Sequence, residues 1–550
     1  MSLTRRARPR AGLALPSALA IGLGLITGCG GTDATAPSMV TKAYPKDLGV
    51  SSVPPSTSAM SPSVNYDKLQ QEQYEHFVDN EFQTVAQHPL STFSADVNTA
   101  SYSNVRRFLD QGKLPPKDAV HIAEFINYFP YSYPSPIGDD PVSFTLDLAP
   151  CPWQPKHHLA RIGVRAREIP ANAMPPRNLV LLVDVSGSMA QETRLPLVKK
   201  SLNLLIDQLT PKDFVSVVVY ASDCGVRLGP TPGSMKQRIR EVVNALEAGG
   251  STNGGSGINL AYQQARANFI EGGANRVILC TDGDFNVGVT SEGELVQLIE
   301  RQRQGNVFLT VLGYGLGNVK NTTMEKLANH GNGHYAYIDS ESEAHKVFVE
   351  QGAALVTVAK DVKFQVEFNP QRVGAYRLIG YENRMLKHED FKNDAKDAGD
   401  IGSGHTVTAL YEIVPAGVPL SLPGVDPLKY QQPTTAPTAA AVSGEWLTAK
   451  MRYKHPTADT SLELVRPLPA DALGKPTSTD FQFAAAVAEF GMLLRQSPYK
   501  GTSNYDHVLT VAEANTGSDP GKHRTEFTAL VRQARRLTKV AAEEPVAGKN

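Results

Sequence analysis

The middle of the chain alternates between short apolar runs and segments with the 3.6-residue periodicity of amphipathic helices. Unbroken runs of Val, Ile and Leu indicate strands that are buried on both faces, as in a parallel sheet covered by helices. This pattern predicts a doubly wound, mostly parallel α/β domain over residues 177–352. Its predicted strands are 179–183, 214–220, 276–281 and 307–312, and its predicted helices are 194–209, 235–246, 258–269 and 292–303.

The segments on either side of this domain alternate between apolar and polar residues, which is typical of strands with one solvated face. We predict an N-terminal α+β module over 65–176, a β-rich module over 353–470 with a Pro/Ala/Thr-rich insertion at 417–443, and a C-terminal helical region over 471–550. We hypothesise that the β segments 142–167 and 362–464 form one sandwich across the α/β domain. Within the N-terminal module the spacing predicts helices at 66–84, 100–111 and 117–129.

The N-terminus has the order of charges and apolar residues found in secretory signals. Arginines within residues 5–10 precede an apolar run over 11–26 that is short and Gly-rich for a permanent membrane span. The run ends at Leu25-Ile26-Thr27-Gly28-Cys29, which resembles the lipobox of bacterial lipoproteins. The resemblance implies a signal peptide over 1–29, acyl chains such as palmitate on Cys29, and, with Gly30 following, attachment to the outer membrane of the cell envelope. An ordinary signal peptide with an incidental cysteine is the alternative.

Composition and charge restrict the classes of partner that we expect for this chain. Residues 30–64 are rich in Ser, Thr, Pro, Ala and Gly and are predicted to be a disordered tether. With 54 Lys+Arg against 55 Asp+Glu the net charge is -1, so a basic field for nucleic acid is absent. No phosphate-binding GxxxxGK[ST] motif occurs, which disfavours a nucleotide ligand.

The remaining cysteines and a histidine pair carry no clear chemistry. Besides Cys29 the chain has Cys151, Cys224 and Cys280, an odd number without a CxxC motif. Cys280 lies in an apolar run, so we predict a buried thiol. The pair His157-His158 has no metal-binding motif and is predicted to be solvated.

Candidate ligands for a metal follow the predicted strands directly. Asp184, Ser186 and Ser188 come after the first strand, Thr252 lies in a Gly-rich loop before a helix, and Asp282 follows the third strand. In a doubly wound fold the carboxyl ends of the strands form the ligand-binding edge. All five side chains offer hard oxygen atoms, which suit Mg²⁺, Mn²⁺ or Ca²⁺ better than zinc. The sequence therefore predicts a divalent-cation site at this edge.

These residues resemble the metal-ion-dependent adhesion site (MIDAS) of the von Willebrand factor type A (VWA) domain. The resemblance implies that Ser186 and Ser188 bind the metal directly, Thr252 directly or through water, and Asp184 and Asp282 mainly through water. It also implies an open coordination position for an Asp or Glu of a protein partner. Residues 93–102 and 114–117 are similar to bacterial VWA lipoproteins of the YfbK-like family. Residues 190–192 lack the paired acids of a second metal site.

The expected function is therefore that of a lipid-anchored, extracytoplasmic binding protein that is not an enzyme. Three alternatives stay open. The Asp, Ser and Gly residues also suit turns and helix caps, with Ser188 as a candidate cap. The chain could then be a structural envelope scaffold whose metal site is unused. A Mg²⁺-dependent phosphatase of the haloacid dehalogenase type is disfavoured, because Ser186 stands where that family has an acidic residue.

Overall fold

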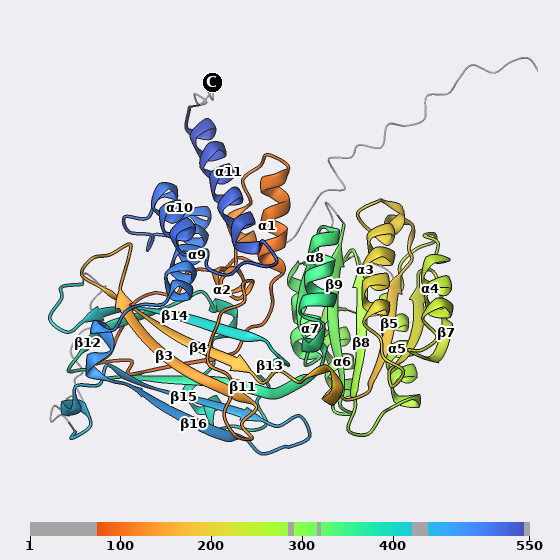
Figure 1. Cartoon of the computed structure of the whole chain (residues 1–550), viewed down its shortest axis with the longest axis horizontal. Coiled ribbons are helices and arrows are strands. Elements are labelled where there is room, and N and C mark those ends of the chain that lie inside the picture. The colour runs from red at the N-terminus through yellow and green to blue at the C-terminus, as the bar shows by residue number, and fades with distance from the viewer. Residues whose placement is uncertain (1–73, 284–290, 316–320, 421–437, 544–550) are drawn as a thin grey trace, which may run out of the picture. The chain divides into compact units, whose positions relative to one another are not determined.

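The computed structural model describes residues 74–283, 291–315, 321–420 and 438–543 (Figure 1). The predicted signal peptide, Cys29, the tether and most of the insertion at 417–443 lie outside these residues. Within the described part of the chain, no helix combines the length and the apolar character that crossing a membrane requires.

The α/β domain contains a six-stranded sheet with the order β10-β9-β8-β5-β6-β7. Every strand pair is parallel except β6 with β7, so the predicted doubly wound, mostly parallel architecture is confirmed. The edge strands β7 and β10 were not predicted. The strands are β5 (Arg177–Asp184), β6 (Phe214–Tyr220), β7 (Cys224–Pro232), β8 (Ala274–Thr281), β9 (Val307–Tyr314) and β10 (Tyr335–Ile338).

Helices cover both faces of this sheet because its central strands present apolar residues to both faces. Leu179, Leu181 and Val183 of β5 pack in one core with α3, α4 and α8, while Val180 and Leu182 pack in the other with α5, α6 and α7. Cys280 is fully buried in the first core, as predicted. The helices are α3 (Leu195–Asp207), α4 (Lys236–Asn244), α5 (Gly254–Ala267), α6 (Glu292–Arg303), α7 (Asn321–His330) and α8 (Glu341–His345).

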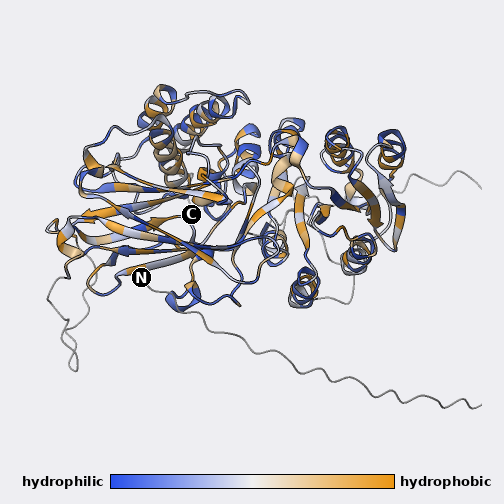
Figure 2. Ribbon diagram, turned by 60° about the horizontal axis from the view of Figure 1, so that its bottom comes forward, coloured by the Kyte–Doolittle hydropathy of each residue, from blue (hydrophilic) through white to orange (hydrophobic). Residues whose placement is uncertain are grey.

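The strands that precede and follow the α/β domain form one β-sandwich. β4 from the N-terminal side pairs with β14 from the C-terminal side over eight residues, which confirms the hypothesis of a shared sandwich. Figure 2 shows the alternating hydrophobic and hydrophilic bands along these strands. One sheet has the order β1 (Gln83–Thr84), β12 (Val373–Ile379), β14 (Thr406–Pro415), β4 (His158–Ala166), β3 (Val142–Pro150); the other has β13 (Gly399–Gly402), β11 (Thr357–Phe368), β15 (Leu447–Lys454), β16 (Leu462–Leu468), with β2 (Leu90–Ser94) beside β11.

A helical layer covers the outer face of the first sheet. Its core joins helices from both ends of the chain to Leu159 of β4, Ile379 of β12 and Leu410 of β14. The neighbouring residues Ala409 and Tyr411 point into the sandwich core instead, as strand alternation requires. The helices are α1 (Ala100–Asp110), α2 (Ile122–Asn127), α9 (Thr479–Arg495), α10 (Tyr505–Ala514) and α11 (His523–Glu543).

One helix prediction in the N-terminal module is wrong, and another is only partly right. Residues 74–82 are irregular and lead into β1, because Phe77 packs on His121 and Phe82 on His157 rather than on one helical face; residues 66–73 lie outside the described part. The helix predicted at 117–129 is broken before α2. There the Ser101 hydroxyl accepts from the His121 backbone N–H and donates to the Ala119 carbonyl, which satisfies both groups outside a helix.

The prediction that His157 is solvated is also wrong. This histidine is buried rather than solvated, and its Nδ1 lies 2.6 Å from Glu412 Oε1. The residue directly before β4 therefore forms a buried polar pair with a carboxylate of β14.

Candidate functional site

Two of the three predicted ligand segments lie at the carboxyl ends of adjacent strands. Asp184 is the last residue of β5, and Asp282 follows β8 directly. Both carboxylates are completely buried. Asp184 Oδ1 accepts from the Ser186 backbone N–H at 2.9 Å, and Oδ2 accepts from the Thr281 hydroxyl at 3.1 Å. These bonds hold the Asp184 carboxylate in one orientation at the edge of the sheet.

The hydroxyl groups of Ser186 and Ser188 lie beside each other, with 3.1 Å between their Oγ atoms. Both residues belong to the turn and short 3-10 helix over Gly187–Ala190. Neither side chain caps a helix: the 3-10 helix has no side-chain cap, and α3 begins after Arg194 without one. The alternative in which Ser188 is a capping residue is therefore wrong.

The Gly-rich loop that carries Thr252 is joined to the same turn. The Gly187 backbone N–H donates to the Gly250 carbonyl at 2.9 Å, and the Gly249 backbone N–H donates to the Val185 carbonyl at 2.7 Å. Gly250 has a φ of 82°, a left-handed conformation that glycine adopts without strain. Thr252 is buried between this loop and the start of α5. The structure thus brings Thr252 into the loop that contacts the Asp184–Ser188 turn.

Arg194 connects the remaining segments and was missed by the sequence analysis. Its Nη1 lies 2.8 Å from Asp282 Oδ2 and also donates to the Ser188 carbonyl at 2.7 Å. Thr281, which orients Asp184, was likewise not assigned a role. An arginine at the first position of a predicted helix has no distinctive spacing, so only its proximity to two ligand segments in the structure reveals this contact.

The electrostatics of the site favour a cation. Burial raises the pKa of Asp184 to about 6; the Ser186 backbone N–H opposes this rise, and the nearby charge of Asp282 adds to it. Arg194 already pairs with Asp282, and a bound cation beside Asp184 would relieve the remaining repulsion between the two carboxylates. The donors are hydroxyl and carboxylate oxygens, which is the set preferred by Mg²⁺ and Ca²⁺. The residues present therefore fit a hard divalent metal ion.

Comparison with known proteins agrees with the class of protein that this fold and site define. Residues 178–351 match the family model described as von Willebrand factor type A domain. Residues 68–161 match a model described as von Willebrand factor, and residues 353–537 match one described as "Uncharacterized protein YfbK, C-terminal". The protein is thus a VWA-domain protein, a class that commonly mediates protein–protein interaction.

A relative covers most of the chain. "Uncharacterized protein YfbK" of Escherichia coli (strain K12) is 42% identical over 476 residues, which are 85% of this chain and 82% of that protein. The chain belongs to the YfbK family, as the resemblance of its motifs predicted.

More distant similarities are confined to part of the chain or to low identity. Human inter-alpha-trypsin inhibitor heavy chain H4 is 28% identical over 181 residues, which are 31% of this chain and 19% of that protein. Among solved structures, a von Willebrand factor type A protein from Catenulispora acidiphila is 16% identical, covers 70% of this chain and 88% of its own, and has a TM-score of 0.39.

Proposed function

We propose that this protein is a lipid-anchored component of the cell envelope that binds an acidic residue of a protein partner through a divalent cation. Mg²⁺, or Mn²⁺ or Ca²⁺ in its place, would be held by Asp184, Ser186, Ser188, Thr252 and Asp282. The metal would supply positive charge to an incoming Asp or Glu carboxylate. In this proposal the chain is a binding module rather than an enzyme, and its anchor is the acylated Cys29.

One observation carries the metal part of the proposal: separate chain segments are hydrogen-bonded around the same edge of the sheet. The turn after β5 contacts the Gly-rich loop through Gly187 and Gly250, and it contacts the segment after β8 through Arg194. Because Ser186 and Ser188 do not cap helices, their adjacent hydroxyls have no such structural explanation. Membership of a VWA family supports a role in protein binding.

The metal site is tested by titrating Mg²⁺ into the full chain in detergent and measuring the heat of binding or the change in melting temperature. We expect saturable binding in the wild type and its loss in Ser186→Ala. Ser256→Ala is the matched control, since this exposed serine lies on α5 near the same loop but is not a proposed ligand. Equal binding by all three chains would contradict the proposed site and favour a scaffold role.

Partner binding is tested by crosslinking in envelope extract with Mg²⁺ or EDTA. A partner retained by the wild type only in Mg²⁺, and lost in Ser186→Ala, would support metal-dependent adhesion. Mg²⁺-dependent phosphatase turnover that is abolished by Asp184→Asn would instead favour the enzyme alternative.

The lipid anchor needs a separate test. We expect the chain to partition into detergent and Cys29→Ser to remain in the aqueous phase, because stable anchoring depends on the acyl chains. Identical partitioning of both chains would contradict lipidation at Cys29.

A further inference from the structure

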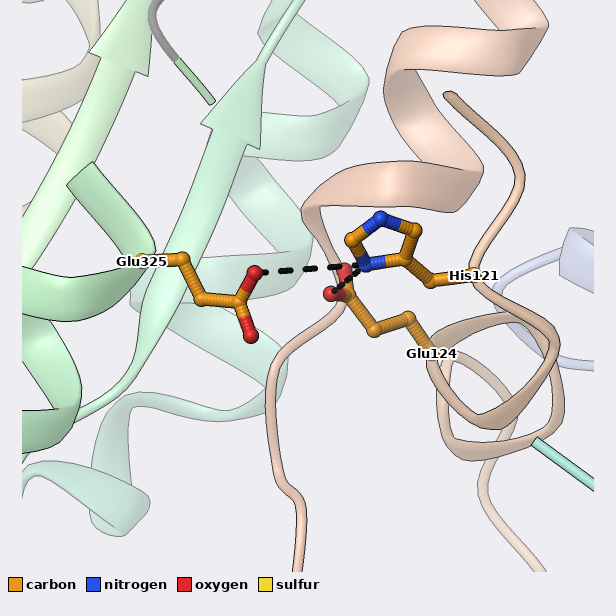
Figure 3. Close-up of side chains that lie close together, drawn as sticks. All are labelled: His121, Glu124 and Glu325. Atoms are coloured by element: carbon orange, nitrogen blue, oxygen red, sulfur yellow. Dashed lines mark hydrogen bonds and ion pairs between the residues drawn. The ribbon is translucent and has the colours of Figure 1, made fainter. Parts of the chain in front are cut away.

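A second group of potential metal ligands lies away from the site just described. Figure 3 shows His121 beside Glu124, with Glu325 reaching toward the same imidazole nitrogen from the other side. His121 Nδ1 is 3.1 Å from Glu124 Oε1 and 3.9 Å from Glu325 Oε2. All three residues are buried, and one ligand atom from each lies within 4.8 Å of the others. Such spacing allows the three atoms to share one ion.

The three residues come from different parts of the fold. His121 and Glu124 lie at the beginning of α2 in the helical layer, whereas Glu325 lies on α7 of the α/β domain. An ion at this point would therefore connect the VWA domain to the helical layer.

Each carboxylate in the group has one oxygen held by a protein donor. Glu124 Oε2 accepts from the Ser101 backbone N–H at 2.8 Å, and Glu325 Oε1 accepts from Asn383 Nδ2 at 2.6 Å. The other oxygens, Glu124 Oε1 and Glu325 Oε2, are the ones directed at His121 Nδ1. Donors that orient the far oxygen of a carboxylate are typical of the surroundings of metal ligands.

A neighbouring carboxylate, that of Asp96, is buried and only partly hydrogen-bonded. Asp96 is 1% exposed, and its Oδ2 has no hydrogen-bond partner among the residues that the structure describes. Its Oδ1 accepts from Arg384 Nη2 at 2.9 Å, and the same nitrogen lies 3.4 Å from Glu325 Oε1. A buried carboxylate oxygen without a donor is costly, so its presence beside this group points to a bound cation or water.

The group is rich in negative charge. The carboxylates of Asp96, Glu124 and Glu325 lie around one guanidinium, that of Arg384. His121 would give up its proton to bind a metal ion, because an imidazole ligand must be neutral. Glu325 and Arg384 also line a cavity of about 510 Å³.

We propose that His121 Nδ1, Glu124 Oε1 and Glu325 Oε2 bind a first-row transition-metal dication, with Asp96 as the adjacent carboxylate. An imidazole nitrogen with two carboxylates suits Zn²⁺ or Mn²⁺ better than Mg²⁺ or Ca²⁺. The site differs in ligands and in position from the oxygen-only site around Asp184. It joins α2 to α7 through coordinate bonds.

The test counts Zn²⁺ bound to the full chain in a Ser186→Ala background, which weakens the site around Asp184. We expect one Zn²⁺ per chain to be lost when Glu325→Gln or His121→Gln is added. His330→Gln is the matched control, because His330 lies on the same helix and pairs with Glu300, but both are 40% exposed. This control is expected to retain the ion.

Equal Zn²⁺ content in the Ser186→Ala parent and the folded Glu325→Gln chain would overturn the proposal, as would a parent that binds no Zn²⁺. If both substitutions prevent folding, the visible spectrum of Co²⁺ bound to the Ser186→Ala parent chain tests the proposal instead. A visible spectrum with imidazole coordination supports the site, and a spectrum of oxygen ligands alone overturns it.

Discussion

Arg194 and Asp282 form a buried ion pair, with 2.8 Å between Nη1 and Oδ2, at the edge of the sheet where the proposed metal ligands gather. The arginine side chain is 5% exposed and the aspartate is fully buried. The same nitrogen donates to the Ser188 carbonyl, so one side chain holds two of the proposed ligand segments. Arg194 is thus a positioning residue for the site.

Replacing Arg194 is expected to destabilise the metal-free chain more than the Mg²⁺-bound chain. In Arg194→Gln the Asp282 carboxylate loses its buried cation, and breaking such a pair costs about 3 kcal/mol. A bound Mg²⁺ would restore part of the positive charge. Thermal denaturation in EDTA and in Mg²⁺ checks this prediction. The rise in Tm on adding Mg²⁺ should be larger for Arg194→Gln than for the wild type. The same rise in both chains would contradict the proposed coupling.

The proposed direct ligand Ser186 is expected to matter for affinity and not for the fold. In Ser186→Ala the Mg²⁺ affinity should fall about tenfold or more, because a coordinating oxygen is lost. The backbone N–H that orients Asp184 remains in this variant. Calorimetric titration with a far-UV circular dichroism spectrum measures both effects. Unchanged affinity would remove Ser186 from the ligand set.

The conformation of the Gly-rich loop should be required for the site. Gly250→Ala would force a left-handed φ on alanine and place its Cβ 2.6 Å from Ser222 Oγ. We expect a loss of roughly 2 kcal/mol in the free energy of unfolding and weaker Mg²⁺ binding.

Gly249→Ala is the matched control for this loop, since its Cβ would meet no atom within 4 Å. Chemical denaturation compares the two chains. Similar losses of stability in Gly250→Ala and Gly249→Ala would contradict the prediction that the left-handed conformation of Gly250 is required.

Asp400 on β13 should make the stability of the chain depend on pH. Burial raises its pKa to about 8, and the charges of Asp397 and Asp361 add to this rise. This pKa lies above the ordinary value of 3.8, so the folded chain holds the Asp400 proton more tightly than the unfolded chain does. The resulting contribution to the free energy of unfolding is fully present below pH 3.8 and is lost as the pH rises through 8. Above pH 8 the buried carboxylate is charged, and its Oδ2 has no partner among the described residues.

Asp400→Asn removes this charge and keeps an oxygen for the Asp361 backbone N–H. At pH 9 we expect the variant to exceed the wild type by on the order of 2 kcal/mol in the free energy of unfolding. At pH 4 the two chains should differ little. Urea denaturation at both pH values measures this, and a difference independent of pH would contradict the role of ionisation.

The α/β domain and the positions of its candidate ligands were predictable because both depend on local order along the chain. Apolar runs that need burial on both faces define the central strands, and residues that follow parallel strands come to one edge. Asp184 and Asp282 were found in this way. The prediction of a helix at 66–84 failed because the local spacing of Phe77 and Phe82 suits a helix. Their actual packing partners, His121 and His157, lie far along the chain and cannot be recognised from local spacing.

The sequence alone determined the identity of the central strands, the oxygen-rich set of candidate ligands and the composition of the N-terminal segment, since these follow from periodicity and residue type. Only the tertiary structure decided the register of β4 against β14, the ion pair of Arg194 with Asp282, and the meeting of His121 and Glu325. His121 and Glu325 are more than 200 positions apart in the chain. Such contacts depend on how separate elements pack, and no local pattern of charge or hydropathy records which distant partner a buried polar side chain will meet.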